Sequence, residues 1–225
     1  MSDALKISGL FDLSHTRAGG YLRSVEYPWQ ALEHIGDWIM EIGRALPPAL
    51  YDHPSESVWI AKSAKVASSA SVTGPCIIDE EAEVRHCAFL RGNTLIGKGA
   101  VVGNSTELKN VILFDGVQVP HYNYVGDSIL GYRAHMGAGA ITSNVKGDKT
   151  LVVIKAGEER LQTERKKVGA FLGDLAEIGC GCVLNPGAVI GKRTQVYPLT
   201  SVRGVLPPDS ICKAQGAVVP KNGQA

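Results

Sequence analysis

The stretch Ile96-Gly97-Lys98-Gly99-Ala100-Val101-Val102-Gly103 decides the fold, because an aliphatic residue returns after six positions with small residues between. The same spacing recurs along most of the chain. The first series is Ile60, Val66, Val72, Ile78, Val84, Leu90, Ile96, Val102, Leu108 and Phe114, and the second is Leu172, Ile178, Leu184, Ile190, Val196 and Val202, with Leu130, Met136 and Thr142 on its grid. A period of six is neither the helical 3.6 nor the strand period of two. It is typical of hexapeptide β-helix repeats.

We therefore expect an all-β protein, a left-handed parallel β-helix in which each hexad forms one face of a triangular prism. One aliphatic side chain per hexad points into a narrow core, and glycines and small polar residues turn the corners, where a positive φ is often needed. The left-handed sense comes from what is known of such repeats and not from their spacing. The register slips between the two series, and we place the slip within residues 115–125.

The repeats divide the chain into three parts. Residues 1–50 are expected to form an N-terminal arm and a capping helix, with residues 1–26 irregular or partly stranded. The helix opens at Pro28 and ends at Pro47-Pro48, and we expect it to cover the open end of the solenoid. Its apolar stripe is Leu32, Ile35, Ile39, Ile42 and Leu46. Residues 51–206 form the β-helix with an inserted loop at about 146–168, and residues 207–225 form a tail.

Composition excludes several classes of function. The net charge of +1 makes nucleic acid an unexpected partner, and no apolar run reaches the ~20 residues of a membrane span. The first residues lack the apolar stretch of a signal peptide. The five cysteines show no disulfide or metal spacing, so we expect buried, reduced thiols. A cytoplasmic protein with no membrane partner is predicted.

The segment Pro120-His121-Tyr122-Asn123-Tyr124-Val125-Gly126-Asp127 breaks the repeat. It places a histidine, two tyrosines and an aspartate where the neighbouring coils have small or apolar residues. Titratable groups concentrated in one segment of a regular scaffold indicate a functional site.

Three motifs in and around this segment resemble one known domain. They are Gly103–Lys109 (GNSTELK), His121–Gly131 (HYNYVGDSILG) and Gly137–Asn144 (GAGAITSN). The domain is the C-terminal acetyltransferase domain of the bifunctional bacterial enzyme that makes UDP-N-acetylglucosamine. Archaeal bifunctional sugar-1-phosphate nucleotidylyltransferases carry it too, and they also resemble Arg165–Gly173 (RKKVGAFLG). The resemblance covers about residues 60–204. No Gly-rich nucleotide loop precedes the repeats, so we expect no uridyl transfer from this chain alone.

The resemblance implies acetyl transfer from acetyl-CoA to the amine of a hexosamine 1-phosphate, either glucosamine 1-phosphate or galactosamine 1-phosphate, feeding UDP-N-acetylhexosamine synthesis. Such an amine is an ammonium ion at neutral pH, and a neutral imidazole is suited to remove its proton. The family places its general base at the position of His121. The thioester oxygen that becomes negative is stabilised mostly by backbone amides in this family. No metal is implied.

Cationic side chains match the phosphate-binding residues of the family at Arg91, Lys109 and Lys149. Arg91 and Lys109 lie 18 residues apart, one coil of the prism, so they are expected to stack on one side. An arginine chelates phosphate oxygens and a lysine adds a point charge. The match at Lys149 depends on a segment that is one residue shorter than in the bacterial enzyme.

Three polar residues match positions that contact the sugar. Tyr124 matches a tyrosine that contacts the sugar phosphate, and Asn144 an asparagine that contacts the sugar. His135 stands where the family has asparagine. This departure leaves open which amino sugar is the acceptor.

The acetyl-CoA site has no short motif of its own. In the family the cofactor lies along the groove between neighbouring prisms, which implies a homotrimer. By resemblance, Ala138, Asp174, Pro198 and Arg203 are cofactor-binding residues, and Arg165–Lys167 are further candidates for the CoA phosphates.

Other functions remain open at this point. The acceptor could be a nucleotide-linked amino sugar, or the chain could be a non-catalytic β-helix subunit that partners a separate nucleotidyltransferase. A zinc site of the γ-carbonic anhydrase type is not predicted, because Gly126 stands where a third histidine should follow His86 and His121.

Overall fold

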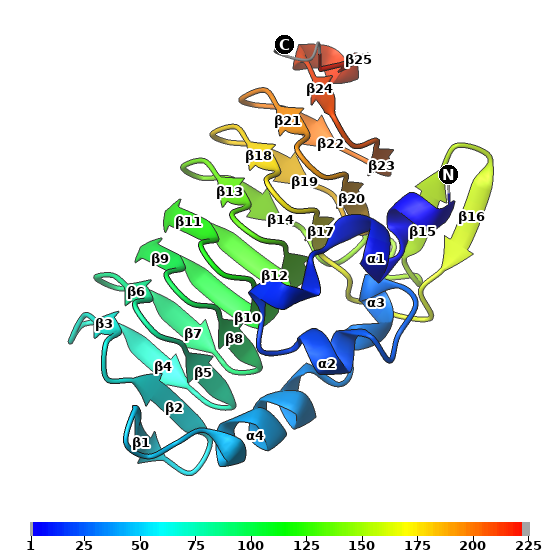
Figure 1. Cartoon of the computed structure of the whole chain (residues 1–225). Coiled ribbons are helices and arrows are strands. Elements are labelled where there is room, and N and C mark those ends of the chain that lie inside the picture. Colours follow the sequence, from blue (N-terminus) through cyan, green and yellow to red (C-terminus); the bar gives the residue numbers. More distant parts are fainter. Residues whose placement is uncertain (1, 222–225) are drawn as a thin grey trace.

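The computed structural model describes residues 2–221, and most of them form a solenoid of short parallel strands (Figure 1). The strands stack in three columns, which we call faces A, B and C. Face A contains β2 (Val58–Ala61), β5 (Cys76–Ile78), β8 (Thr94–Ile96), the second halves of β10 (Glu107–Leu113) and β12 (Tyr124–Leu130), β17 (Ala170–Leu172), β20 (Ala188–Ile190) and β23 (Val205–Leu206). The predicted β-helix is thereby confirmed.

The other two faces complete each coil. Face B contains β3 (Lys65–Val66), β6 (Glu83–Val84), β9 (Val101–Asn104), β11 (Gln118–His121), β13 (His135–Met136), β18 (Glu177–Ile178), β21 (Gln195–Val196) and β24 (Ser210–Cys212). Face C contains β4 (Ser71–Thr73), β7 (Phe89–Arg91), the first halves of β10 and β12, β14 (Ile141–Thr142), β19 (Val183–Leu184) and β22 (Ser201–Val202).

Antiparallel strands cover the ends of the stack. β1 (Tyr51–Ser55) pairs with β2 in the first coil, and β25 (Val218–Pro220) pairs with β24 in the last. Such pairing removes edges that would otherwise be open to another chain. A third antiparallel pair, β15 (Val153–Ala156) and β16 (Glu159–Gln162), forms a hairpin within the predicted insertion.

The register of the stack shifts twice. Coils are 18 residues long where Thr94 stacks on Cys76, but only 17 residues separate Asn110 from Asp127. One residue is lost between Leu108, which pairs with Leu90, and Leu113, which pairs with Ile96. A second is lost after Val125, so the single slip predicted within 115–125 is wrong. Phe114 therefore does not occupy a core position of the six-residue series. It packs against Phe11 of the arm, with ring centroids 5.1 Å apart.

The N-terminal region is helical and packs on face A. Its elements are η1 (Ser2–Leu5), α1 (Ile7–Leu10), η2 (Leu13–His15), α2 (Gly19–Leu22), α3 (Pro28–Ala31) and α4 (Ile35–Ala45). A further short helix, η3 (Ala214–Gly216), lies between β24 and β25. The irregular or stranded arm predicted for residues 1–26 is therefore wrong. The helix predicted from Pro28 is interrupted between α3 and α4. We expected it at an open end of the solenoid, but α4 contacts β5, β8 and β10 along the flank.

The apolar runs of face A explain this position. All three residues of β5, β8, β17 and β20 are buried, with no alternation between apolar and polar positions. A strand with this pattern is covered on both of its sides. One side faces the core of the solenoid and the other faces the arm, where Trp29 lies 6.1 Å from Phe171 between ring centroids. Faces B and C stay free of the arm.

A buried ionic contact fixes the arm to the solenoid. Arg17 Nε donates to Asp79 Oδ2 at 2.6 Å and Arg17 Nη2 donates to Tyr51 Oη at 2.8 Å. The Tyr51 hydroxyl also donates to Asp79, whose side chain is 3% exposed. Burial, the largest cause, and then the hydrogen bond to Asp79 raise the pKa of Tyr51. The phenol therefore remains a donor at neutral pH.

The cysteines differ in their exposure. Cys76, Cys182 and Cys212 are buried as expected, whereas Cys87 and Cys180 are exposed. All five are free thiols.

We expect Arg17→Ala to lower the free energy of unfolding by about 3 kcal/mol, because it leaves the Asp79 carboxylate buried without its cation. Arg23→Ala removes an exposed arginine from the same arm and is the matched control. Urea unfolding of both variants measures the difference. Equal stability of the two variants would contradict a role for this ion pair in fixing the arm.

Candidate functional site

Face C carries the predicted phosphate-binding pair. Leu108 pairs with Leu90, which places Lys109 of β10 beside Arg91 at the end of β7. Both side chains point away from the core, because the leucines beside them point into it. Arg91 Nη1 donates to Glu107 Oε1 at 2.5 Å. This contact raises the pKa of the exposed Arg91 guanidinium, which is cationic at every physiological pH.

A ladder of polar side chains runs along the corner between faces C and A. Asn93, Asn110, Asp127 and Asn144 follow one another at intervals of 17 residues. Asn110 Nδ2 donates to Asp127 Oδ1 at 2.9 Å, and Asn144 Nδ2 donates to Asp127 Oδ2 at 2.6 Å. Asn110 and Asp127 are buried and have positive φ values of 55° and 48°. The Asp127 carboxylate thus holds the amide of Asn144 in one orientation.

Tyr124 joins this ladder to face C. Asn144 Nδ2 lies 3.3 Å from Tyr124 Oη, and Tyr124 is the register partner of Glu107 on the next strand. Burial, then the nearby Asp127 and Glu107 carboxylates, raise the pKa of the half-buried Tyr124 phenol. Tyr124 is therefore a neutral hydroxyl at physiological pH. The structure places Tyr124 and Asn144 beside the Arg91–Lys109 pair, which the sequence predicted to stack on one side.

His121 lies at the corner between faces B and C, at the end of β11, and is exposed. Its backbone is held on two sides, because His121 N donates to Asn123 Oδ1 at 3.1 Å and His121 O accepts from Gly139 N at 3.0 Å. Ala138 lies beside it on the next coil. Asn104 is the register partner of His121, and its buried Oδ1 has no hydrogen-bond partner among the described residues.

His135 lies on face B instead, and Pro198 lies in the turn between β21 of face B and β22 of face C. His135 Nδ1 lies 2.9 Å from Glu177 Oε2, and His135 and Pro198 line a shallow hollow of about 310 Å³. Faces B and C of a prism point in different directions. A ligand bound on face C of one chain therefore does not reach His135 of the same chain, unless it extends around the corner that the two faces share.

Asp174 is engaged by the arm. Its carboxylate accepts from Asp12 N at 2.7 Å and Tyr132 N at 2.9 Å, and it lies 3.0 Å from Lys192 Nζ. It is 6% exposed and sits between faces A and B. The structure does not bring Asp174 near the Arg91–Lys109 pair, and its contacts are those of a residue that anchors the arm.

The remaining predicted residues lie toward the insertion. Lys149 is exposed in a turn, with a φ of 57°, and its backbone N–H donates to Lys146 O. Arg203 is exposed on face C, immediately after β22.

Sequence reasoning assigned no role to Asn110, Asp127 or Glu107. The interval of 17 residues that relates Asn93, Asn110, Asp127 and Asn144 was a signal for the ladder. It was hidden because the dominant six-residue period predicts coils of 18 residues. Glu107 gave no signal, since only the register shows that it faces Arg91.

The comparisons with known proteins agree with this architecture. Residues 72–157 match the family model described as the GMPPB C-terminal domain. The chain is 30% identical over 216 residues to the bifunctional protein GlmU of Methanococcus maripaludis, an alignment that covers 87% of this chain and 48% of that protein. It is 25% identical over 197 residues to the bifunctional sugar-1-phosphate nucleotidylyltransferase/acetyltransferase of Sulfurisphaera tokodaii, covering 80% and 45%.

The resemblance to GlmU-type proteins is confirmed. The chain spans about half the length of these relatives. Among solved structures, a hexapeptide transferase family protein from Anaplasma phagocytophilum is similar, with a TM-score of 0.42 and 14% identity over 74% of this chain and 80% of that one.

Within residues 2–221, no group of three or more His, Cys, Asp or Glu side chains could hold a metal ion. None of the helices within this range has the length and apolar character needed to cross a bilayer.

We expect Asp127→Ala to lower the free energy of unfolding by about 2 kcal/mol, because it removes one hydrogen-bond acceptor from each of two amide groups at the corner. Asp52→Ala removes an exposed aspartate and is the matched control. Chemical denaturation measures both variants. A loss no larger than that of Asp52→Ala would show that the ladder does not hold the corner.

Proposed function

We propose that this chain is an N-acetyltransferase that moves the acetyl group of acetyl-CoA to the amine of a hexosamine 1-phosphate. The observation that carries this proposal is the grouping of Arg91 and Lys109 with Tyr124 and Asn144 on one face, close to the corner that presents the exposed His121. Two cations suit a sugar phosphate, and an accessible imidazole suits deprotonation of an amine. The likeness to GlmU-type relatives supports the same activity.

His121 acts as the general base. Its imidazole takes a proton from the ammonium group of the acceptor, and the free amine then attacks the thioester carbonyl of acetyl-CoA. As the tetrahedral oxyanion collapses and the C–S bond breaks, the attacking nitrogen loses its remaining extra proton and the leaving CoA thiolate takes up one proton. The products are an N-acetylhexosamine 1-phosphate and CoA, and no metal takes part.

The phosphate of the acceptor binds between Arg91 and Lys109. Arg91 is held by Glu107 in the free protein, so the phosphate competes with this carboxylate for the guanidinium. Lys109 is half-buried and makes no ion pair within residues 2–221, which leaves its charge available for the ligand. Tyr124 and Asn144, oriented by Asp127, supply neutral hydrogen-bonding groups to the sugar.

The active assembly is a homotrimer. His135 lies on face B, whereas the phosphate-binding pair lies on face C. A second chain that packs its face B opposite face C of the first brings the two groups to one seam. The seam also supplies the groove for acetyl-CoA, next to Ala138 and His121.

The activity is tested by mixing the protein with acetyl-CoA and one acceptor and measuring the release of free CoA thiol. We expect release with glucosamine 1-phosphate or galactosamine 1-phosphate, and none without an acceptor. Release only with a nucleotide-linked amino sugar would assign that class of acceptor instead. No release with any amino sugar would refute the proposed function.

His121→Ala is expected to lower kcat by about 10²–10⁴-fold, because the ammonium group loses its base. The matched control is His53→Ala, which removes an exposed histidine from β1 in the first coil. Steady-state rates of CoA release at saturating acceptor measure both variants. An unchanged kcat in His121→Ala would exclude His121 as the base.

A further inference from the structure

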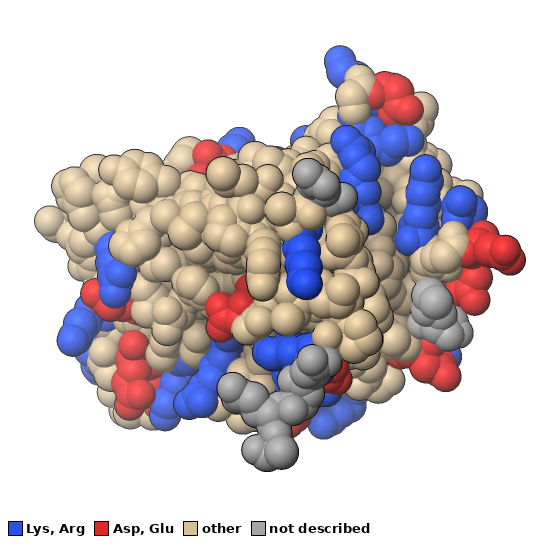
Figure 2. Space-filling model, turned by 90° about the horizontal axis from the view of Figure 1, so that it is seen from above, with Lys and Arg blue, Asp and Glu red and all other residues tan. Residues whose placement is uncertain are grey.

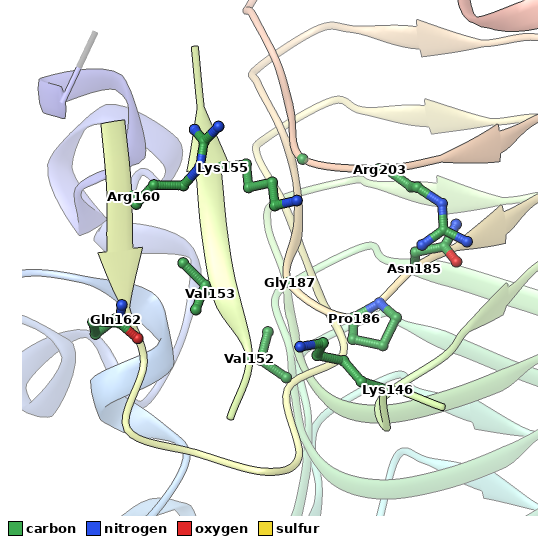
Figure 3. Close-up of a pocket in the computed structure, with 11 residues that line it drawn as sticks. Lys146, Val152, Val153, Lys155, Arg160, Gln162, Asn185, Pro186, Gly187 and Arg203 are labelled. Carbon is green, nitrogen blue, oxygen red and sulfur yellow. The ribbon is translucent and has the colours of Figure 1, made fainter. Parts of the chain in front are cut away.

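The hairpin of β15 and β16 and the solenoid enclose a basic cavity between them. The cavity has a volume of about 430 Å³. Figure 3 shows Lys155, Arg160 and Gln162 on the hairpin side and Asn185 and Arg203 on the solenoid side. In Figure 2, basic side chains gather at the right, the side that carries the hairpin in Figure 1.

The charges of this cavity are unbalanced. Its lining contains four cationic residues and no carboxylate: Lys146, Lys155, Arg160 and Arg203. Lys146 lies 3.4 Å from Asp148, outside the lining. The other three make no ion pair with the described residues, and Arg160 Nη1 donates only to the backbone oxygens of Gly157 and Glu159. Cations gathered without counter-charges favour an anionic ligand.

The cavity is preformed by close backbone contacts. Gly204, with a φ of 74°, lies so near the hairpin that an added Cβ would be 2.9 Å from Lys155 O. Gly187, with a φ of 78°, meets Val152 in the same way. Arg165 Nη1 lies 3.2 Å from Glu33 Oε2 of the arm, which fixes the base of the hairpin. Binding here therefore requires little ordering of the wall.

The cavity is separate from the Arg91–Lys109 pair. From Lys109 the strands of face C lead through Gly126, Ser143 and Asn185 to Arg203. Arg203 is thus four strands from Lys109 along face C, and four strand spacings amount to about 19 Å. A single sugar phosphate bound at Lys109 does not reach this far. The cations of the cavity must then serve a different phosphorylated group.

We propose that this cavity binds the end of a nucleotide that carries two phosphates. The phosphates contact Lys155 and Arg203, and the apolar part of the lining, Val152, Val153 and Pro186, accommodates the nucleoside. Two ligands of the proposed reaction could supply this chemistry: the 3′-phosphoadenosine end of CoA, and the diphosphate of a nucleotide-linked acceptor. This assignment of the ligand rests on the proposed acetyl transfer, whereas the anion site rests on the geometry.

Calorimetric titration of the whole chain tests the proposal without measuring acetyl transfer. The probes are adenosine 3′,5′-bisphosphate for the CoA end, UDP for a nucleotide-linked sugar, and inorganic pyrophosphate. We expect one of the two nucleotides to bind more tightly than pyrophosphate, and to bind more weakly as salt rises. The preferred nucleotide identifies the source.

The double variant Lys155→Ala/Arg203→Ala is expected to weaken that binding roughly 10- to 100-fold. Lys98→Ala/Lys213→Ala removes the same charge elsewhere on the surface and should bind as the wild type does. Equal weakening in the two double variants, or no binding of either nucleotide to the wild type, would overturn the proposal. If pyrophosphate binds as tightly as the nucleotides, the proposed contact between the apolar lining and the nucleoside is wrong. Acetyl transfer without nucleotide binding in the cavity would refute this proposal and leave the proposed function intact. Nucleotide binding in the cavity without acetyl transfer would do the reverse.

Discussion

The narrow core of the solenoid is the constraint on which the other features depend. Each coil has room for one aliphatic side chain per face, as at Ile78, Ile96 and Leu113, and these side chains stack on those of the next coil. Stacking forces every coil into register with its neighbours. Outward residues then form straight columns along each face, so residues about one coil apart in sequence become neighbours in space. A cluster such as Arg91 with Lys109 is a direct result of this regularity.

The arm decides which faces remain available. Face A is apolar on its outer side as well as its inner side, and the helices of residues 2–45 cover it. Contacts from Arg17 to Asp79 and from Asp12 to Asp174 hold the arm at two heights of the stack. The part of face A under the arm is therefore closed to ligands and to neighbouring chains. His121 lies at the corner between the two other faces.

The polar site exists because the repeat is imperfect. The loss of one residue in each of two successive coils places Asn110 and Asp127 at the corner where Asn93 and Asn144 also lie. Buried amides and a carboxylate are stable there because they satisfy one another's hydrogen bonds. The ladder places Asn144 against Tyr124 and leaves the insertion to emerge just beyond it. The proposed sugar site and the wall of the basic cavity thus begin at the same point of the fold.

The sequence by itself determined the β-helix, the position of the insertion and most of the residues on face C, because a six-residue period and local motifs are properties of the chain order. It misplaced Phe114 and the helical arm, since a loss of one residue per coil and packing against a doubly apolar face become visible only when coils stack. The sequence did not show that the arm occupies the carboxylate of Asp174, because this contact joins residues far apart in the chain. Only the tertiary structure decided that Lys155 and Arg203 meet across one cavity, because no sequence period relates a hairpin to the coils against which it folds.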